Sequence, residues 1–180
     1  MSSLLLLSGG IDSALCLAGM RDIKLCLGID YGQSHLIELD SARRIAADAG
    51  VEYLEVKIPS LQKINGEIFA GRNLVLISIA ASIAQFRGLD QIIIGCNKSD
   101  WGMFPDCRYA FISAASAAVA AYGCSVLAPL LTNTKAEILS MAKRCGVMEE
   151  TTWTCYSPRN GMQCGECHAC RVMGEANACL

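Results

Sequence analysis

Short apolar runs alternate with longer amphipathic stretches along most of the chain. The short runs, rich in Leu, Ile and Val, predict strands at residues 4–7, 24–30, 53–58, 91–95 and 126–128. The longer stretches predict helices at about residues 13–20, 35–49, 73–87, 109–122 and 134–145. This alternation is typical of an α/β fold, in which right-handed crossovers place helices on both faces of a parallel sheet. Ligands of such folds bind at the carboxyl ends of the strands.

The composition divides the chain into one large part and a short C-terminal part. The 180 residues, 53% hydrophobic and 18% charged, suffice for one buried core and argue against disorder. From Thr151 onward Cys, Gly and polar residues prevail. We therefore expect an α/β domain at residues 1–150 and a small appendage at residues 151–180, packed together as one structural unit.

The charge pattern favours a small-molecule substrate over nucleic acid or a membrane. The formal net charge is −2 and Lys and Arg form no basic stripe, so direct nucleic-acid binding is not expected. Residues 109–131 carry no charge, but they are mostly Ala, Ser and Gly and are interrupted by Gly123 and Pro129. They predict a buried helix, a turn and a short strand. The N-terminus does not resemble a signal peptide, so we expect a cytoplasmic protein.

A phosphate-binding loop is predicted directly after the first strand, where residues 8–13 read SGGIDS. Gly9 and Gly10 let the backbone approach an oxyanion, and the following helix points its positive dipole end at the same place. Ser8 and Ser13 add hydroxyl donors. The alternative is an ordinary strand–turn–helix. The hexapeptide lacks the lysine of the Walker pattern and resembles the loop of the ATP pyrophosphatases, which split ATP to adenylate a substrate.

Four of the eleven cysteines have the spacing of a metal site, C-x8-C-x2-C-x2-C. Tetrahedral Zn²⁺ takes four thiolates, and a site with all positions filled is structural. An iron–sulfur cluster is the chemical alternative, because it uses the same ligand set. His168 lies inside this segment, where it could replace one ligand or be an exposed bystander. The expected zinc ligands are Cys155, Cys164, Cys167 and Cys170.

Taken together, the motifs resemble the 7-cyano-7-deazaguanine synthase family of ATP pyrophosphatases. The matching segments run in the family's order over nearly the whole chain. They are 8–13 (SGGIDS), 30–35 (DYGQSH) with Glu38, 71–73 (GRN), 95–100, 105–108 (PDCR), 134–138 (TKAEI) and 152–170 (TWTCY through CGECHAC).

This resemblance implies conversion of 7-carboxy-7-deazaguanine to the nitrile with ammonia and ATP. A carboxylate is a poor electrophile, and adenylation gives it AMP as a leaving group. Ammonia then forms an amide, and a second activation removes water. The resemblance also implies an adenine-nucleotide α-hydrolase-like fold and Mg²⁺ bridging the ATP phosphates.

The expected ATP site combines the phosphate loop with the ends of two other strands. Asp12 is expected to reach the phosphates through the metal, and Lys135 to neutralise charge on the leaving pyrophosphate. The alternative for Lys135 is an exposed lysine in a first helical turn, an unfavourable place without an anion nearby. The expected ATP contacts are Ser8, Gly9, Gly10, Asp12, Ser13, Asp30, Tyr31 and Lys135.

Substrate contacts are expected around the buried helix and the loop after the fourth strand. Arg72 suits a carboxylate, Asn73 could cap its helix, and Asp106 and Arg108 are either substrate contacts or plain helix-start residues. The expected substrate contacts are Gln33, His35, Arg72, Asn73, Asp100, Asp106 and Arg108. Of these, Asp106 and Arg108 join Asp12 and Lys135 as expected catalytic groups. Cys107 is expected to be a packed thiol, and His35 a cap or a proton carrier.

The chain departs from the family pattern between residues 56 and 71, where it is shorter than usual. That change puts the identity of the accepted deazapurine in doubt. A related enzyme that adenylates a tRNA base or a protein is the first alternative, and an interaction module on a degenerate nucleotide-binding domain is the second. No feature fixes the oligomeric state, and a homodimer remains open.

Overall fold

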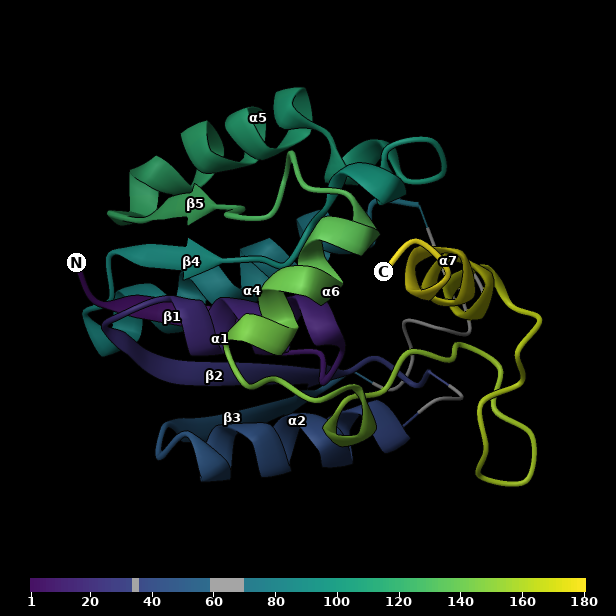
Figure 1. Cartoon of the computed structure of the whole chain (residues 1–180). Helices are drawn as coiled ribbons and strands as arrows, with labels where there is room; N and C mark the ends of the chain where they lie inside the picture. Colours follow the sequence, from purple (N-terminus) through teal and green to yellow (C-terminus); the bar gives the residue numbers. More distant parts are fainter. Residues whose placement is uncertain (34–35, 59–69) are drawn as a thin grey trace.

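A parallel sheet forms the centre of the computed structural model, which describes residues 1–33, 36–58 and 70–180 (Figure 1). Its five strands lie in the order β3-β2-β1-β4-β5, and all neighbours pair in parallel. The strands are β1 (Ser3–Leu6), β2 (Ile23–Asp30), β3 (Glu52–Lys57), β4 (Gln91–Ile93) and β5 (Ser125–Leu127). The predicted parallel α/β fold is confirmed.

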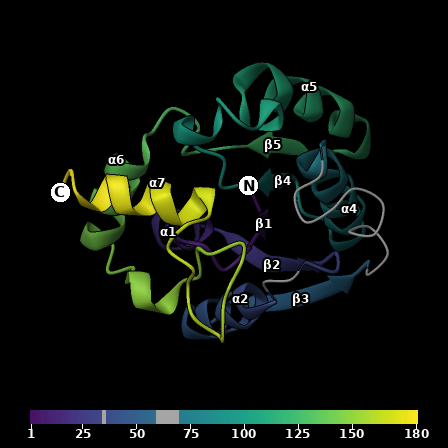
Figure 2. The same ribbon diagram turned by 90° about the vertical axis from the view of Figure 1, so that its right-hand side faces the viewer.

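Helices cover both faces of the sheet, as Figure 2 shows. One face packs against α4 (Arg72–Arg87) and α5 (Tyr109–Val119). The other packs against α1 (Ile11–Gly19), α2 (Ile37–Asp48) and α6 (Lys135–Arg144). The four residues of β1 are all buried because its side chains alternate between these two cores.

The strand order reverses beside β1, since β2 follows on one side and β4 on the other. In open α/β sheets, a crevice forms outside the carboxyl ends of the strands at such a reversal. The loops that follow β1 and β4 therefore meet there. These loops contain the SGGIDS sequence and residues 97–108, which include two short 3-10 turns, Lys98–Asp100 and Pro105–Cys107.

Two helix starts differ from the prediction. Helix α1 begins at Ile11, after Gly10 in an extended conformation, so Asp12 and Ser13 belong to its first turn. Asn73 does not cap α4, because Gly71 occupies the N-cap position with φ 76° and makes no side-chain cap. Instead, the backbone N–H of Asn73 donates to Oδ2 of Asp106 at 3.0 Å.

The C-terminal segment contains a helix that the sequence did not predict, α7 (His168–Asn177). Met173 and Ala176 of this helix form a small core with Ile11 of α1 and with Leu139 and Ala142 of α6. The segment is thereby attached to the α/β domain. Its division from residues 1–150 as a domain stays a prediction.

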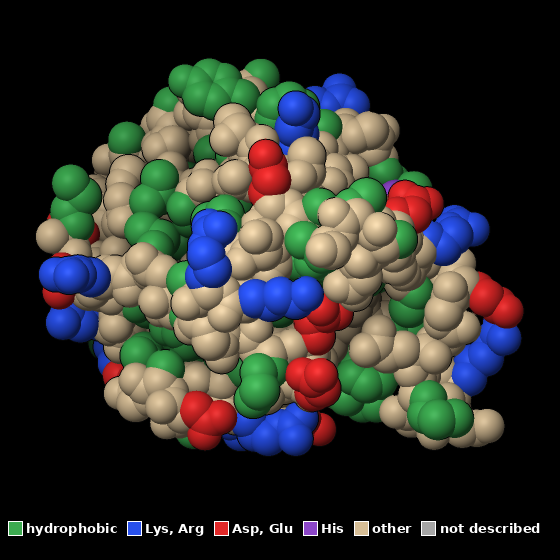
Figure 3. Space-filling view, in the orientation of Figure 1, with side chains coloured by type: hydrophobic (Ala, Val, Ile, Leu, Met, Phe, Trp, Pro, Cys, Tyr) green, Lys and Arg blue, Asp and Glu red, His purple; other side chains and the backbone are tan. Residues whose placement is uncertain are grey.

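The surface mixes both signs of charge. On the face shown in Figure 3, Lys and Arg side chains lie among Asp and Glu side chains without merging into one basic band. Residues 109–131 form α5, a 3-10 turn and β5, in the predicted order, but α5 is not a buried helix, because only Ile112, Ala115 and Val119 of it are buried. Among the described helices, none combines the length and the hydropathy that crossing a bilayer requires. Cys145, near the end of α6, is exposed.

Candidate active site

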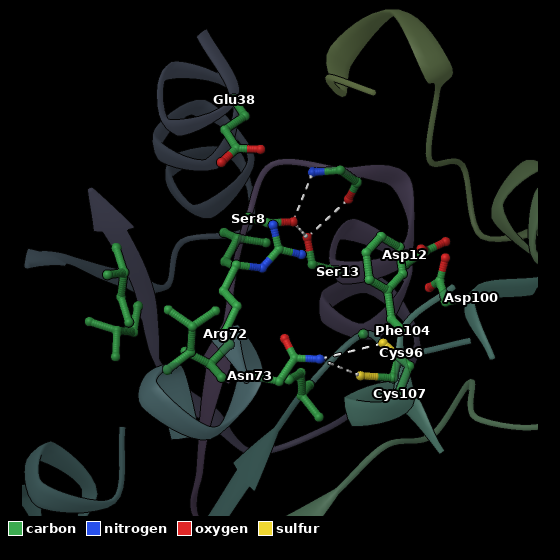
Figure 4. A pocket seen from close by; sticks show the side chains of 18 of the residues that line it. Ser8, Asp12, Ser13, Glu38, Arg72, Asn73, Cys96, Asp100, Phe104 and Cys107 are labelled. Carbon is green, nitrogen blue, oxygen red and sulfur yellow. Dashed lines mark hydrogen bonds between the residues drawn. The ribbon is translucent and has the colours of Figure 1, made fainter. Parts of the chain in front are cut away.

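The loop after β1 folds into a small polar cradle. Gly9 has φ 86°, and a Cβ there would overlap the backbone oxygen of Glu38, so the loop lies directly against α2. The Ser8 and Ser13 hydroxyls are 3.2 Å apart, and the Gly10 N–H donates to Ser8 at 3.3 Å (Figure 4). Ser13 donates to the Gly10 carbonyl at 3.0 Å. The cradle therefore holds hydroxyl groups and a helix N-terminus together, as an oxyanion site requires.

A charged cluster lies beside this cradle. The Lys135 ammonium is 2.7 Å from both carboxylate oxygens of Asp12, and the two side chains are only 12% and 19% exposed. Asn97 is fully buried, and its amide donates to Asp12 at 3.0 Å and to Asp100 at 2.8 Å. Burial and the Asp12 charge raise the pKa of Asp100. One amide thus joins two carboxylates next to one lysine.

Two adjoining cavities open from the cradle, of about 180 Å³ and about 110 Å³. The predicted residues that line the larger one are Ser8, Gly10, Asp12, Ser13, Tyr31, Arg72, Asn73 and Asp100. The smaller one shares several of these and adds Lys135 and His168. The structure therefore brings most of the predicted ATP and substrate residues to one crevice.

Arg72 is the cation of the larger cavity. It extends toward Ser8 and Glu38 (Figure 4), donates to the Tyr31 hydroxyl at 3.2 Å and lies 6.0 Å from the centre of that ring. Burial works against its charge, but the neighbouring tyrosines and Glu38 outweigh burial and raise the pKa of Arg72. The guanidinium is thus a permanent positive charge in a partly apolar cavity.

Several cavity residues had no predicted role. Burial raises the pKa of Glu38 to about 7, and burial also raises the pKa of Tyr156. Both side chains line the two cavities. Glu38 and Tyr156 stood in motifs of the family resemblance, as did Asn97, and this was the only signal that could have found them.

Four predicted residues lie outside both cavities and make hydrogen bonds near them. Asp30 accepts from the Gly32 N–H at 2.9 Å, and the Gln33 amide is held by Tyr31, Ile29 and Glu38. Asp106 caps α4, and Arg108 donates from Nε to the Trp101 carbonyl at 2.8 Å. None of the four lines either cavity, so their contact with a ligand stays a prediction. His35 lies outside the described residues.

Two buried thiols close the floor of the larger cavity. The Asn73 amide donates to the sulfur of Cys96 at 3.6 Å and to that of Cys107 at 3.4 Å. A hydrogen bond with Cys107, together with burial, raises the pKa of Cys96 well above its usual range. Cys96 is therefore a protonated thiol, and Cys107 is packed as predicted.

The four predicted metal ligands meet at one point. The sulfur atoms of Cys155, Cys164, Cys167 and Cys170 all lie within 4.8 Å of one another, a set that can hold a metal ion. The same segment touches the SGGIDS loop, because the Trp153 N–H donates to the Gly9 carbonyl at 2.9 Å. The segment that contains the four cysteines therefore forms a wall of the crevice.

Replacing Asn97 by aspartate tests the charged cluster. Asn97→Asp keeps the oxygen that accepts from the Ser99 N–H but removes the donor and adds a third carboxylate. We expect a loss of about 2–3 kcal/mol in the free energy of unfolding at pH 8. Mutual repulsion raises the carboxyl pKa values in the folded state, so the loss should shrink as the pH falls toward 5. Urea unfolding at both pH values measures it, and an equal loss at pH 5 and pH 8 would contradict the cluster.

Solved structures with the same architecture include an NH3-dependent NAD synthetase from Campylobacter jejuni, with a TM-score of 0.57 and 24% identity over 83% of this chain and 66% of that one. A U34-tRNA thiolase, NcsA, from Methanococcus maripaludis, solved with its [4Fe-4S] cluster, has a TM-score of 0.61 and 14% identity over 99% of this chain and 64% of that one. This chain thus spans slightly less than two thirds of either structure. At these identities the likeness shows the fold.

The sequence comparisons are more specific. The family model for the queuosine biosynthesis protein QueC matches residues 2–69 and 66–178. A 7-cyano-7-deazaguanine synthase from Anaeromyxobacter dehalogenans is 34% identical over 94% of this chain and 88% of that protein. A second 7-cyano-7-deazaguanine synthase, from Synechococcus sp., is 33% identical over 97% of this chain and 92% of that protein. The chain belongs to the QueC family of queuosine biosynthesis proteins.

Proposed function

We propose that this chain makes 7-cyano-7-deazaguanine from 7-carboxy-7-deazaguanine, ammonia and ATP. The observation that carries the proposal is the crevice itself, in a chain of this family. A phosphate cradle and the Asp12–Lys135 pair adjoin a cavity that contains the half-buried cation Arg72. Such a site suits one anionic nucleotide and one carboxylate held side by side.

The reaction needs two activations. First, a substrate carboxylate oxygen attacks the α-phosphorus of ATP, and pyrophosphate leaves. Ammonia then attacks the acyl carbon, loses a proton and displaces AMP, which leaves the amide. In the second round the amide oxygen is adenylated, the nitrogen loses its remaining protons, and AMP departs with that oxygen as the nitrile forms.

The phosphate end of ATP is assigned to the cradle and to Lys135. Ser8, Gly10 and Ser13 offer donors at the start of α1, and the macrodipole of that helix favours the same anion. Lys135 stands in the first turn of α6, where its ammonium can move from Asp12 to the departing pyrophosphate. Asp30 is the last residue of β2 and Tyr31 follows it, and we place the adenosine contacts at these two residues.

The carboxylates at this place fit a hard divalent cation. Asp12 and Asp100 point oxygens at one shared amide, and oxygen is the ligand that Mg²⁺ prefers. When bound, Mg²⁺ would neutralise the phosphate charge that the two carboxylates would otherwise repel.

The deazapurine is assigned to the apolar part of the larger cavity. Arg72 would pair with its carboxylate, and Asn73 and Asp100 would contact the ring from either side. Asp106 and Arg108 are proposed as rim contacts and catalytic groups, and Gln33 as a support of the same wall. We place the reaction in the cytoplasm, where ATP and ammonia are available.

We further propose that the four cysteines hold structural zinc. A single tetrahedral ion accepts four thiolates as close together as these sulfur atoms. A cluster of four iron atoms would hold its thiolates farther apart. Zinc also leaves no open coordination position, which agrees with a supporting role at the wall of the crevice.

Mass spectrometry of the nucleobase tests the reaction. Metal-replete protein with ATP, Mg²⁺, ammonium and 7-carboxy-7-deazaguanine should produce the nitrile. Lys135→Ala should lower kcat about 100-fold or more, because charge on the departing pyrophosphate is no longer neutralised. The matched control is Lys143→Ala, which removes an exposed lysine from the last turn of the same helix and should stay within twofold of the unaltered chain.

Accumulation of the amide would mean that the first activation operates without the second. No turnover of the acid, with ATP still bound, would contradict the proposed substrate and favour another acceptor for the same activation. Equal activity of the two lysine variants would remove Lys135 from the mechanism.

Elemental analysis tests the metal. The purified chain should contain about one zinc per molecule and no stoichiometric iron. Cys167→Ser should lose the metal and part of the thermal stability, since metal binding contributes to folding. Cys145→Ser, at an exposed thiol outside the cluster, should retain both. Iron with acid-labile sulfide in place of zinc would contradict the assignment.

A further inference from the structure

Glu38 lies at the junction of the two cavities. It belongs to the first turn of α2, and its side chain projects toward the guanidinium of Arg72 (Figure 4). In the described part of the chain, the carboxylates that line both cavities are Glu38, Asp12 and Asp100. Glu38 therefore borders both the space assigned to the ATP phosphates and the space assigned to the deazapurine.

The other two carboxylates belong to the charged cluster. Asp12 is 2.7 Å from the Lys135 ammonium and accepts from the Asn97 amide, which also donates to Asp100. Both are assigned above to the divalent cation. Glu38 comes from a different helix and is the carboxylate that remains for chemistry at the acyl carbon.

A buried amide holds Glu38 in place. Gln33 is only 2% exposed and donates from Nε2 to Oε1 of Glu38 at 3.1 Å and to the Ile29 carbonyl at 3.2 Å. Its oxygen accepts from the Tyr31 N–H at 2.8 Å, so the orientation of the amide is fixed. A group that transfers a proton during a reaction needs such a fixed position.

The groups that face Glu38 suit a base at neutral pH. Burial raises the pKa of Glu38 to about 7, although the hydrogen bond from Gln33 and the charge of Arg72 oppose this rise. Tyr53 and Tyr156 also interact with Glu38, but burial raises the pKa of both phenols, so they stay neutral. A carboxylate with this pKa is ionised near neutral pH and accepts a proton more readily than an ordinary one.

The proposed reaction removes every proton of ammonia from one nitrogen atom, so a proton acceptor is needed beside the acyl carbon. Arg72 would pair with the substrate carboxylate, and the reacting carbon would then lie next to its guanidinium. Glu38 projects toward that guanidinium and also borders the phosphate cradle. Its carboxylate thus has the position that the proton acceptor requires.

We propose that Glu38 is the catalytic base that accepts protons from the nitrogen of the attacking ammonia. As the nitrogen–carbon bond forms, one carbonyl electron pair moves onto oxygen, and Glu38 takes an N–H proton. The carbonyl then forms again, and the bond to AMP breaks with its electron pair on AMP. In the second round Glu38 takes protons from the same nitrogen as the nitrile forms, and it releases each proton to solvent. The inference deepens the proposed function and rests on it.

Glu38→Gln removes the base and keeps an oxygen that can accept from Gln33. Conversion of the acid to amide and nitrile should fall about 100-fold or more. Acid-dependent exchange of labelled pyrophosphate into ATP should stay within about threefold, because the first adenylation needs no proton acceptor. The matched control is Asp40→Asn, which neutralises an exposed carboxylate in the same helical turn and should stay within about twofold in both assays.

The pH profile distinguishes a base from a structural support. At a fixed concentration of unprotonated ammonia, amide formation by the unaltered chain should rise about tenfold between pH 6 and pH 8, because a carboxyl group with a pKa of about 7 becomes ionised over this range. Glu38→Gln should lack this rise.

Equal losses in pyrophosphate exchange and amide formation would overturn the inference, since Glu38 would then only support the site. A Glu38→Gln profile with the same rise would overturn it too. If the unaltered chain makes the nitrile and Glu38→Gln does so equally fast, this inference alone fails. If the unaltered chain shows no acid-dependent exchange, the proposed substrate fails and the inference fails with it.

Discussion

The contact between Lys135 and Asp12 joins residues 123 positions apart and fixes the centre of the crevice. Because each side chain is mostly buried, removing either partner would leave a buried unpaired charge and lower the free energy of unfolding. The pair requires that α1 and α6 begin at the same sheet edge, which the parallel topology provides. Asn97, from the loop after β4, adds a third element to this contact, because its side-chain amide donates to Asp12. In the proposed reaction, the ammonium exchanges this carboxylate for the phosphate that the cradle receives.

The C-terminal segment is joined to this centre in two ways. The Trp153 backbone donates to Gly9 in the phosphate loop, and Met173 packs on α1 and α6. Metal binding by the four cysteines would therefore stabilise the wall of the crevice as well as the segment itself. Because residues of the first turn of α7 line the smaller cavity, the cysteine cluster and the crevice are parts of one structure.

The sequence predicted the features that local chemistry determines. Apolar periodicity was sufficient for the five strands and for their parallel arrangement, because buried strands and amphipathic helices have distinct patterns, but it did not predict the order of the strands in the sheet. Two glycines after a strand were sufficient for the cradle. The spacing of four cysteines was sufficient for their convergence, since each C-x2-C step brings two thiolates into one turn.

Features that depend on distant partners were not predictable in this way. Asn73 was a possible cap of α4, but it does not cap this helix, because Asp106, from a loop 33 positions later, accepts from the Asn73 N–H instead. Helix α7 was missed although its sequence is amphipathic, because the segment was interpreted from its cysteines alone. Met173 and Ala176 pack this helix against α1 and α6. Nothing local marks Asn97 as the residue that joins two carboxylates, or Glu38 as a cavity residue with a raised pKa.

In the proposed reaction, one nucleotide site activates the same carbon twice, first as a carboxylate and then as an amide. The most direct measurement is the amount of AMP formed per nitrile during complete conversion of a limited quantity of 7-carboxy-7-deazaguanine. Two molecules of AMP and two of pyrophosphate per nitrile would agree with two successive adenylations at the Asp12–Lys135 centre. One molecule of AMP per nitrile would contradict it, because the amide would then lose its oxygen without adenylation.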